Sequence, residues 1–113
     1  MLKVDIIVFA VAALGGLLLM ARRVSGKDRP LPFALGHGLF AASGLVLLAY
    51  IFMAQPARAE MIKLPLILFV FTAMGGFFLF SYRLRRKEFP VAAGTVHGML
   101  AVASFLTLLF KNI

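Results

Sequence analysis

Residues suited to chemistry are few in this chain, and the two histidines stand out among them. His37 and His97 are the only histidines, and each lies in an apolar run beside a glycine, in the segments LGHGLFAASG and TVHGMLAVAS. Neutral imidazole is a common ligand of transition metals and of haem iron. An ionisable side chain inside an apolar run is a functional candidate when that run crosses a membrane. The chemistry open to the two histidines therefore depends on the elements that carry them.

The composition predicts a membrane protein. Of 113 residues, 63% are hydrophobic, whereas soluble domains are typically about half apolar. A bilayer core about 30 Å thick needs about 20 apolar residues per helix. Four runs approach or exceed this length, at 4–21, 31–54, 64–82 and 89–110. We therefore expect residues 1–113 to form one all-α integral membrane domain, a four-helix bundle.

Positive charge gathers in two short segments between these runs. The formal net charge is +8, and basic loops beside membrane spans mark the cytoplasmic side. We expect loops 22–30 and 83–88 to be cytoplasmic, both termini to lie outside, and the protein to occupy a bacterial inner membrane. The charge then reflects orientation and contact with membrane lipid, and predicts no nucleic-acid partner. The basic residues of the two loops are Arg22, Arg23, Lys27, Arg29, Arg83, Arg85, Arg86 and Lys87.

The chain repeats itself at an offset of 60 residues. Alignment of residues 1–50 with 61–110 without a gap gives fifteen identities, which is the pattern of a two-helix hairpin used twice. The first-half members are Met1, Lys3, Ile7, Phe9, Ala13, Gly15, Gly16, Leu19, Arg23, Lys27, Pro30, His37, Gly38, Ala41 and Leu48.

A hairpin that crosses the membrane twice returns to its starting side, so two such repeats are parallel and related by an axis along the membrane normal. His37 and His97 correspond to each other in the repeat, which predicts that they lie at one depth. Each follows a proline, Pro30 or Pro90, by seven residues. At 1.5 Å per residue, this places the histidines about 10 Å below the cytoplasmic boundary.

Small residues surround both histidines at helical spacing. Such stripes often let two helices touch, and GxxxG spacing favours that packing. A large imidazole at the centre of a seam opposes close contact, however, so we interpret the small residues as room for a flat cofactor. The slot is predicted to comprise Ala34, Ala41 and Gly44 around His37 and Gly94, Ala101 and Ser104 around His97, with clearance from Gly15, Gly16, Gly75 and Gly76.

A single b-type haem fits this pattern. His37 and His97 would supply both axial ligands of the iron. Arg22, Arg23 and Arg83 lie near the same interface and are expected to pair the haem propionates through charge-assisted hydrogen bonds. The absence of cysteine excludes disulfides, thiolate-held clusters and covalent haem attachment.

With its histidines on LGHGLFAASG and TVHGMLAVAS, the chain resembles the small four-helix membrane b-type cytochromes of the cytochrome b561 kind. The resemblance implies haem b between facing histidines and electron exchange with a quinone or a small redox partner. Those proteins commonly hold two haems on four histidines, whereas this chain offers ligands for one. Electron transfer near the cytoplasmic face, or haem handling, is therefore the expected role, within a monomer or a homo-oligomer.

Two other functions fit parts of the pattern. A cofactor-free membrane anchor or assembly subunit would also use the repeat and the small-residue spacing. A small four-helix transporter has similar length, but proton-coupled export needs a carboxylate inside the membrane. The four acidic residues, Asp5, Asp28, Glu60 and Glu88, are all expected at helix ends or in loops. The chain carries no paired carboxylates or phosphate-binding loop, so any enzymatic activity would be redox chemistry at a bound haem.

Overall fold

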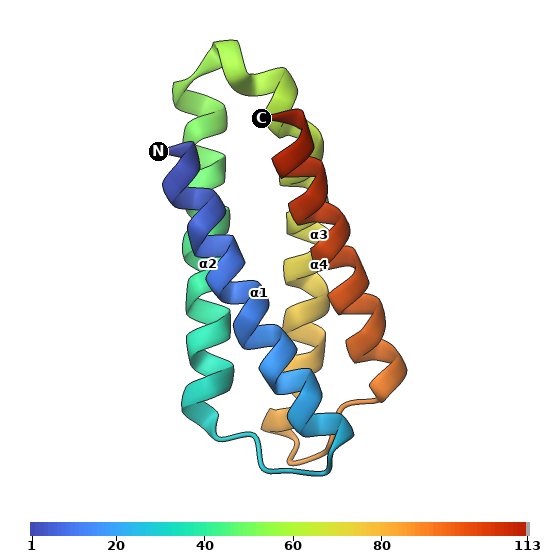
Figure 1. Cartoon of the computed structure of the whole chain (residues 1–113). Coiled ribbons are helices and arrows are strands. Elements are labelled where there is room, and N and C mark those ends of the chain that lie inside the picture. The colour runs from blue at the N-terminus through green and yellow to red at the C-terminus, as the bar shows by residue number, and fades with distance from the viewer. Residues whose placement is uncertain (113) are drawn as a thin grey trace.

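The computed structural model describes residues 1–112, and residue 113 lies outside the described part. Its four long helices are α1 (Leu2–Val24), α2 (Leu31–Ala54), α3 (Ala59–Leu84) and α4 (Val91–Lys111), and a short 3-10 turn, η1 (Pro56–Arg58), joins α2 to α3 (Figure 1). The expectation of an all-helical protein with four long apolar helices is confirmed.

The helices α1 and α3 end in the same way, at positions sixty residues apart. Gly26 and Arg86 both have a positive φ, of 70° and 56°. In each case the next residue donates its backbone N–H to the carbonyl oxygen of the residue five positions earlier. Lys27 bonds to Arg22 and Lys87 to Tyr82, both over 2.8 Å. This is the helix-ending motif that usually places glycine at the left-handed position. Arg86 adopts the same conformation at a higher steric cost.

Prolines define where the second helix of each hairpin begins. Pro30 and Pro90 precede α2 and α4 in extended conformations, with ψ of 142° and 135°. Proline fixes φ and has no N–H to donate, so it suits the start of a helix. Each loop is therefore a tight turn followed by a short extended segment.

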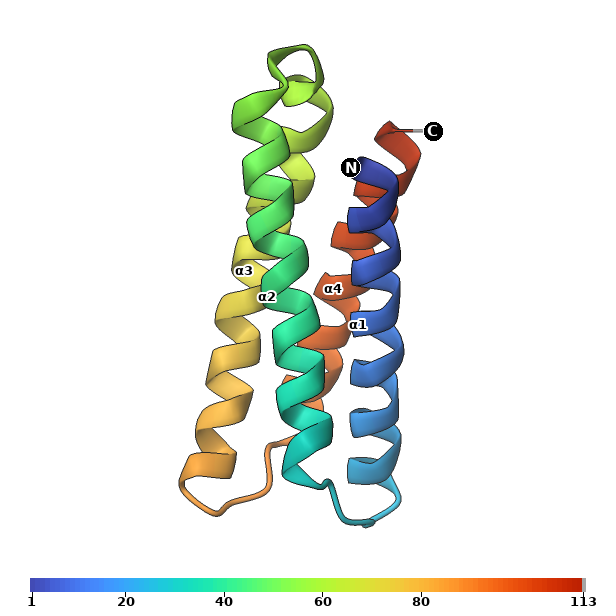
Figure 2. The same cartoon turned by 90° about the vertical axis from the view of Figure 1, so that its left-hand side faces the viewer.

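The bundle has two distinct ends. Figures 1 and 2 show the chain termini and η1 together at one end, here called the terminus end, and the loops at residues 25–30 and 85–90 at the other, here called the loop end. Contacts between helices are most extensive within the hairpins α1–α2 and α3–α4, and α2–α3 and α1–α4 close the bundle. Consequently α1 lies diagonally opposite α3, and α2 diagonally opposite α4.

Burial follows the same order in the two halves of the chain. Residues 41–50 and 101–110 have identical successions of buried, half-buried and exposed positions. The buried core contains the corresponding pairs Leu2 with Ile62 and Leu48 with Leu108. The two hairpins therefore present equivalent faces to the interior.

A stacked aromatic pair crosses the centre of the bundle. The rings of Phe9 and Phe69 lie parallel within 2°, with centres 3.9 Å apart. They come from the diagonal helices α1 and α3 and occupy corresponding positions. Gly44 makes room for this pair, because a Cβ atom there would lie 2.8 Å from a ring carbon of Phe9.

The outer surface of the bundle is apolar. Leu14, Val46 and Phe77 are each more than two-thirds exposed. All four helices are long and apolar enough to cross a membrane. Side chains of this kind remain on the outside of a protein whose helices are surrounded by lipid.

Substitution of Gly44 tests the packing around Phe9. We expect Gly44→Ala to destabilise the bundle by about 1–3 kcal/mol, because a well-packed interior must shift to admit an extra methyl group. The measurement is thermal unfolding in detergent micelles. Gly38→Ala is the matched control, since a Cβ atom at this α2 glycine has open space around it. Equal stability of the two variants would contradict the packing described here.

Candidate functional site

His37 is held by the backbone of the neighbouring helix. Its Nδ1 atom lies 2.7 Å from the carbonyl oxygen of Ala12 on α1. A carbonyl oxygen only accepts hydrogen bonds, so Nδ1 carries the proton and donates it. In the neutral ring, Nε2 then holds the lone pair. This is the arrangement in which a histidine is oriented to bind a metal through Nε2.

His97 occupies the corresponding place on α4. The backbone of Thr72, sixty residues after Ala12, lies near the imidazole of His97, but the Nδ1 atom of His97 is buried without a well-formed hydrogen bond within residues 1–112. Buried polar atoms without partners are rare in folded proteins. The second imidazole is therefore less firmly oriented than the first.

The two imidazoles lie close together in a T-shaped arrangement, although they come from the diagonal helices α2 and α4. Their ring centres are 6.4 Å apart, and the ring planes are inclined at 89°. With bonds of about 2 Å from metal to nitrogen, and each nitrogen about 1 Å from its ring centre, two imidazoles on opposite sides of one metal ion have centres about 6 Å apart. The distance between the ring centres of His37 and His97 matches this value, while the Nε2 atom of each ring lies near the glycine pair of its own hairpin, within 4 Å of a Cβ atom built at Gly16 or Gly76.

The paired glycines of α1 and α3 accommodate the imidazoles themselves. A Cβ atom at Gly16 would lie 2.8 Å from Cε1 of His37, and one at Gly15 would lie 3.5 Å from Cβ of His37. On the other side, Cβ atoms at Gly75 and Gly76 would lie 3.2 and 3.3 Å from the ring of His97. Each glycine pair thus forms a niche for the histidine of its own hairpin.

The residues predicted to line a cofactor slot differ in the side chains that they contact and in how far they are buried. Gly44 faces Phe9, and a Cβ atom at Gly94 would meet the ring of Phe89 and the sulfur of Met20. Ser104 is buried, and its hydroxyl lies 3.1 Å from that of Thr72 and donates to the carbonyl of Leu100. The three alanines, Ala34, Ala41 and Ala101, are half-buried.

Two of the predicted arginines tie the two halves together at the loop end. Arg23 donates to the carbonyl of Phe89 over 2.8 Å, and Arg83 donates to the carbonyl of Arg29 over 2.7 Å. Positions 23 and 83, and 29 and 89, correspond in the two halves, so the bonds are reciprocal. Sequence reasoning missed this use of the arginines, although the repeated arginine was a visible signal.

The remaining charged groups of the loop end lie around these bonds. Arg22 donates to the carbonyl of Asp28 over 2.9 Å within its own loop. The exposed carboxylate of Glu88 lies 3.6 Å from Arg23 and 3.9 Å from Arg29. These side chains place several cationic groups at the end of the bundle nearest the histidines.

A small hollow lies beside His37, between α1 and α2. Its volume is about 240 Å³, below the usual range of about 300–1,000 Å³ for ligand pockets. A macrocycle at the imidazole pair therefore requires neighbouring side chains to move. The lining consists of Val11, Gly15, Leu18, Pro32, Phe33, Gly36, His37 and Phe40.

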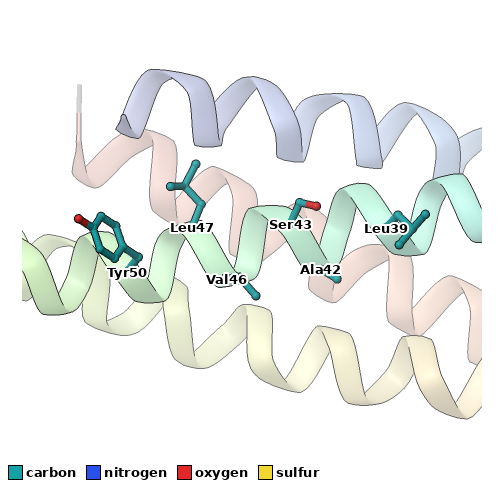
Figure 3. A pocket seen from close by; sticks show the side chains of 6 residues that line it. All are labelled: Leu39, Ala42, Ser43, Val46, Leu47 and Tyr50. Carbon is teal, nitrogen blue, oxygen red and sulfur yellow. The ribbon is translucent and has the colours of Figure 1, made fainter.

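A larger and more open groove of about 650 Å³ runs along α2 (Figure 3). It is lined by Leu39, Ala42, Ser43, Val46, Leu47 and Tyr50 and contains neither histidine. Across residues 1–112, no group of three or more histidine and carboxylate side chains is placed to hold a metal ion.

All four acidic residues lie at helix ends or in loops, as expected, but one of them is buried. Asp28, Glu60 and Glu88 are exposed as expected, but Asp5 is fully buried, with 0% of its surface exposed. The reason is that α1 begins at Leu2, so that Asp5 falls on the inner face with Leu2 and Phe9. The expected position of Asp5 at a helix end is confirmed, whereas its burial was not predicted from the sequence.

Comparisons with models of protein families, with curated proteins and with solved structures find no match to this chain.

The glycine niche of His37 can be tested directly. We expect Gly16→Ala to displace the imidazole and to weaken its bond to Ala12, because the new methyl group would lie within 2.8 Å of the ring. In ¹⁵N-histidine-labelled protein, the hydrogen-bonded Nδ1–H resonance of His37 should shift or disappear. Gly98→Ala on α4, where a Cβ atom meets nothing within 4 Å, should leave it unchanged. An unaltered resonance in Gly16→Ala would refute the niche.

Proposed function

We propose that the chain is a multi-pass membrane protein that binds one haem b through His37 and His97 and takes part in electron transfer, with haem handling as the related role. The observation that carries the proposal is the pair of imidazoles with ring centres 6.4 Å apart on diagonal helices. A quinone or a small redox partner would exchange the electrons.

The chemistry of the donor pair supports haem rather than another metal. Two neutral imidazoles without a carboxylate or thiolate nearby make a poor zinc or copper site, whereas they complete the coordination of a haem iron. When bound, a haem held by His37 and His97 would supply a one-electron redox centre. The carbonyl of Ala12 fixes the tautomer of His37 and increases the basicity of its Nε2 atom.

The surroundings of the pair can serve the rest of the cofactor. Phe33 and Phe40 line the hollow beside His37 and are partly exposed, so they are free to move outward. The cationic side chains of Arg22, Arg23 and Arg83 lie at the loop end, on the same side of the bundle as the histidines. Each keeps donors beyond the bond it already makes, because guanidinium carries five N–H groups.

We further propose that the two hairpins are parallel repeats, with the loop end in the cytoplasm and the termini outside. The repeat is supported by the matching burial of residues 41–50 and 101–110 and by the reciprocal bonds of Arg23 and Arg83. The orientation is supported by the concentration of basic residues in the two loops. The membrane is proposed to be a bacterial inner membrane.

A second candidate function is a cofactor-free anchor or assembly subunit. The observation that favours it is the close fit of both imidazoles into the glycine niches at Gly15, Gly16, Gly75 and Gly76. In that role, the histidines would serve as polar contacts between helices, of the kind that stabilise membrane bundles by about 1 kcal/mol. The two candidates differ in whether the purified protein holds haem.

The visible spectrum of the detergent-purified protein tests haem binding. We expect a sharp Soret band and resolved α and β bands on reduction, the signature of a six-coordinate iron. His37→Ala and His97→Ala should each lose this spectrum, because each removes one axial ligand. The measurement is the absorbance of protein expressed with sufficient haem or reconstituted with it.

Ser43→Ala on α2 and Thr107→Ala on α4 serve as controls for this experiment. They alter polar residues on the same two helices, and Thr107 bonds only within its own helix. Both controls should keep the wild-type spectrum. A wild-type protein that stays colourless after addition of haem would refute the proposal and favour the anchor role.

The absence of cysteine makes the orientation accessible to single-cysteine labelling. Ser25→Cys at the loop end and Ala57→Cys in η1 introduce thiols at exposed positions. With a membrane-impermeant reagent on intact cells, we expect Ala57→Cys to react and Ser25→Cys to react only after permeabilisation. The opposite pattern would overturn the proposed orientation.

A further inference from the structure

Asp5 is a carboxylate that the proposed haem site does not use. It lies in the first turn of α1, with 0% of its surface exposed, and neither of its oxygens has a hydrogen-bond partner within residues 1–112. Most buried carboxylates are paired or hydrogen-bonded, because an isolated buried charge is very costly. An unpartnered Asp5 therefore needs a physical explanation.

The surroundings of Asp5 are apolar. On the inner face of α1 it lies between Leu2 and Phe9, which belong to the same hydrophobic cluster as Leu48, Ile62 and Leu108. These residues come from all four helices, so the carboxyl group points into the interior of the bundle rather than toward its surface.

The second half of the chain has no carboxylate at this place. Position 65, which corresponds to Asp5, is a proline that is itself fully buried inside α3. Pro65 has no N–H, so the carbonyl of Met61 loses its helical partner. That carbonyl instead accepts a bond from Nδ2 of Asn112 over 3.2 Å. The helical hydrogen bonding of α3 is thus interrupted at the terminus end, on the helix diagonally opposite α1.

No cation neutralises Asp5. The other charged and titratable groups described at the terminus end are exposed, and neither of the two ion pairs in the described chain involves Asp5. These groups are the amino terminus and Lys3 on α1, Tyr50 on α2, Arg58 in η1, Glu60 and Lys63 on α3, and Lys111 on α4.

We propose that Asp5 is an intramembrane proton-binding site. A metal cation needs several oxygen ligands, and within residues 1–112 no group of three or more histidine and carboxylate side chains gathers around Asp5. A proton needs only the one carboxyl group. Its binding removes the charge and makes the burial of Asp5 compatible with the apolar interior.

The position of Asp5 allows its proton to exchange. The amino-terminal end of a helix favours negative charge, and Asp5 lies in the first turn of α1. This effect opposes the cost of burial and stabilises the carboxylate whenever water reaches it. Terminal turns open readily, so opening of the first turn of α1 connects the site with the aqueous phase at the terminus end.

Infrared spectroscopy of the full chain in phosphatidylcholine vesicles tests the site. At neutral pH, the wild type should display the C=O stretch of a protonated carboxylic acid, and transfer to D₂O should shift it. Asp5→Asn should lose this band, whereas Glu60→Gln, which removes an exposed acid from the same end, should keep it. Asp5→Glu should retain a protonated-acid band at a different frequency, which guards against a folding defect in Asp5→Asn.

Two outcomes would overturn the proposal. One is a wild type without a protonated-acid band at neutral pH, which means that Asp5 is ionised. The other is loss of the band when potassium or choline is replaced by sodium, which identifies a cation as the occupant. The site is independent of haem, so His37→Ala and His97→Ala should leave the band unchanged.

Discussion

The close approach of each imidazole to its neighbouring helix is the constraint on which the candidate site depends. A side chain at Gly16 would lie within 2.8 Å of the ring of His37, so only glycine admits the ring in this position. The ring then reaches the carbonyl of Ala12, one turn earlier on the same face of α1. This contact sets the orientation of His37, and the corresponding niche sets that of His97. The 6.4 Å separation of the two rings follows from two niches on opposite sides of one bundle.

Equivalent positions in the two halves carry different side chains where their packing partners in the interior differ. Gly44 leaves room for the ring of Phe9, whereas Ser104 at the corresponding position meets the hydroxyl of Thr72. Thr72 in turn corresponds to Ala12. A glycine beside an aromatic ring on one side is thus matched by a pair of hydroxyl groups on the other. The stacked Phe9 and Phe69 remain common to both halves and keep the centre filled.

The sequence was sufficient to predict four long apolar helices, because their hydropathy and spacing are strong local signals. The pairing of the two histidines rested on the repeat and remains a prediction as a haem site. The glycine pairs were expected to clear space for a cofactor, but the structure places the imidazoles against them. The sequence does not distinguish these two uses, because a glycine leaves the same space for a cofactor as for a histidine side chain.

The burial of Asp5 escaped sequence analysis for a different reason. Whether a residue near a helix end is exposed depends on where the helix begins and which face meets its neighbours, and end positions are the least certain part of a sequence-based assignment. The reciprocal bonds of Arg23 and Arg83 likewise depend on long-range contacts, since each arginine reaches a carbonyl in the other half of the chain.

The reciprocal arginine bonds and the buried Asp5 make the two ends of the bundle differ in how readily they open. At the loop end, each hairpin donates an arginine to a backbone carbonyl of the other, so separation of the hairpins would break both bonds. At the terminus end, the fully buried Asp5 has no hydrogen-bond partner within residues 1–112, and Pro65 interrupts the hydrogen bonding of α3. Local opening is expected where polar groups lack strong bonds. The terminus end can therefore open to water while the arginine bonds keep the hairpins, and with them the histidine pair, in place.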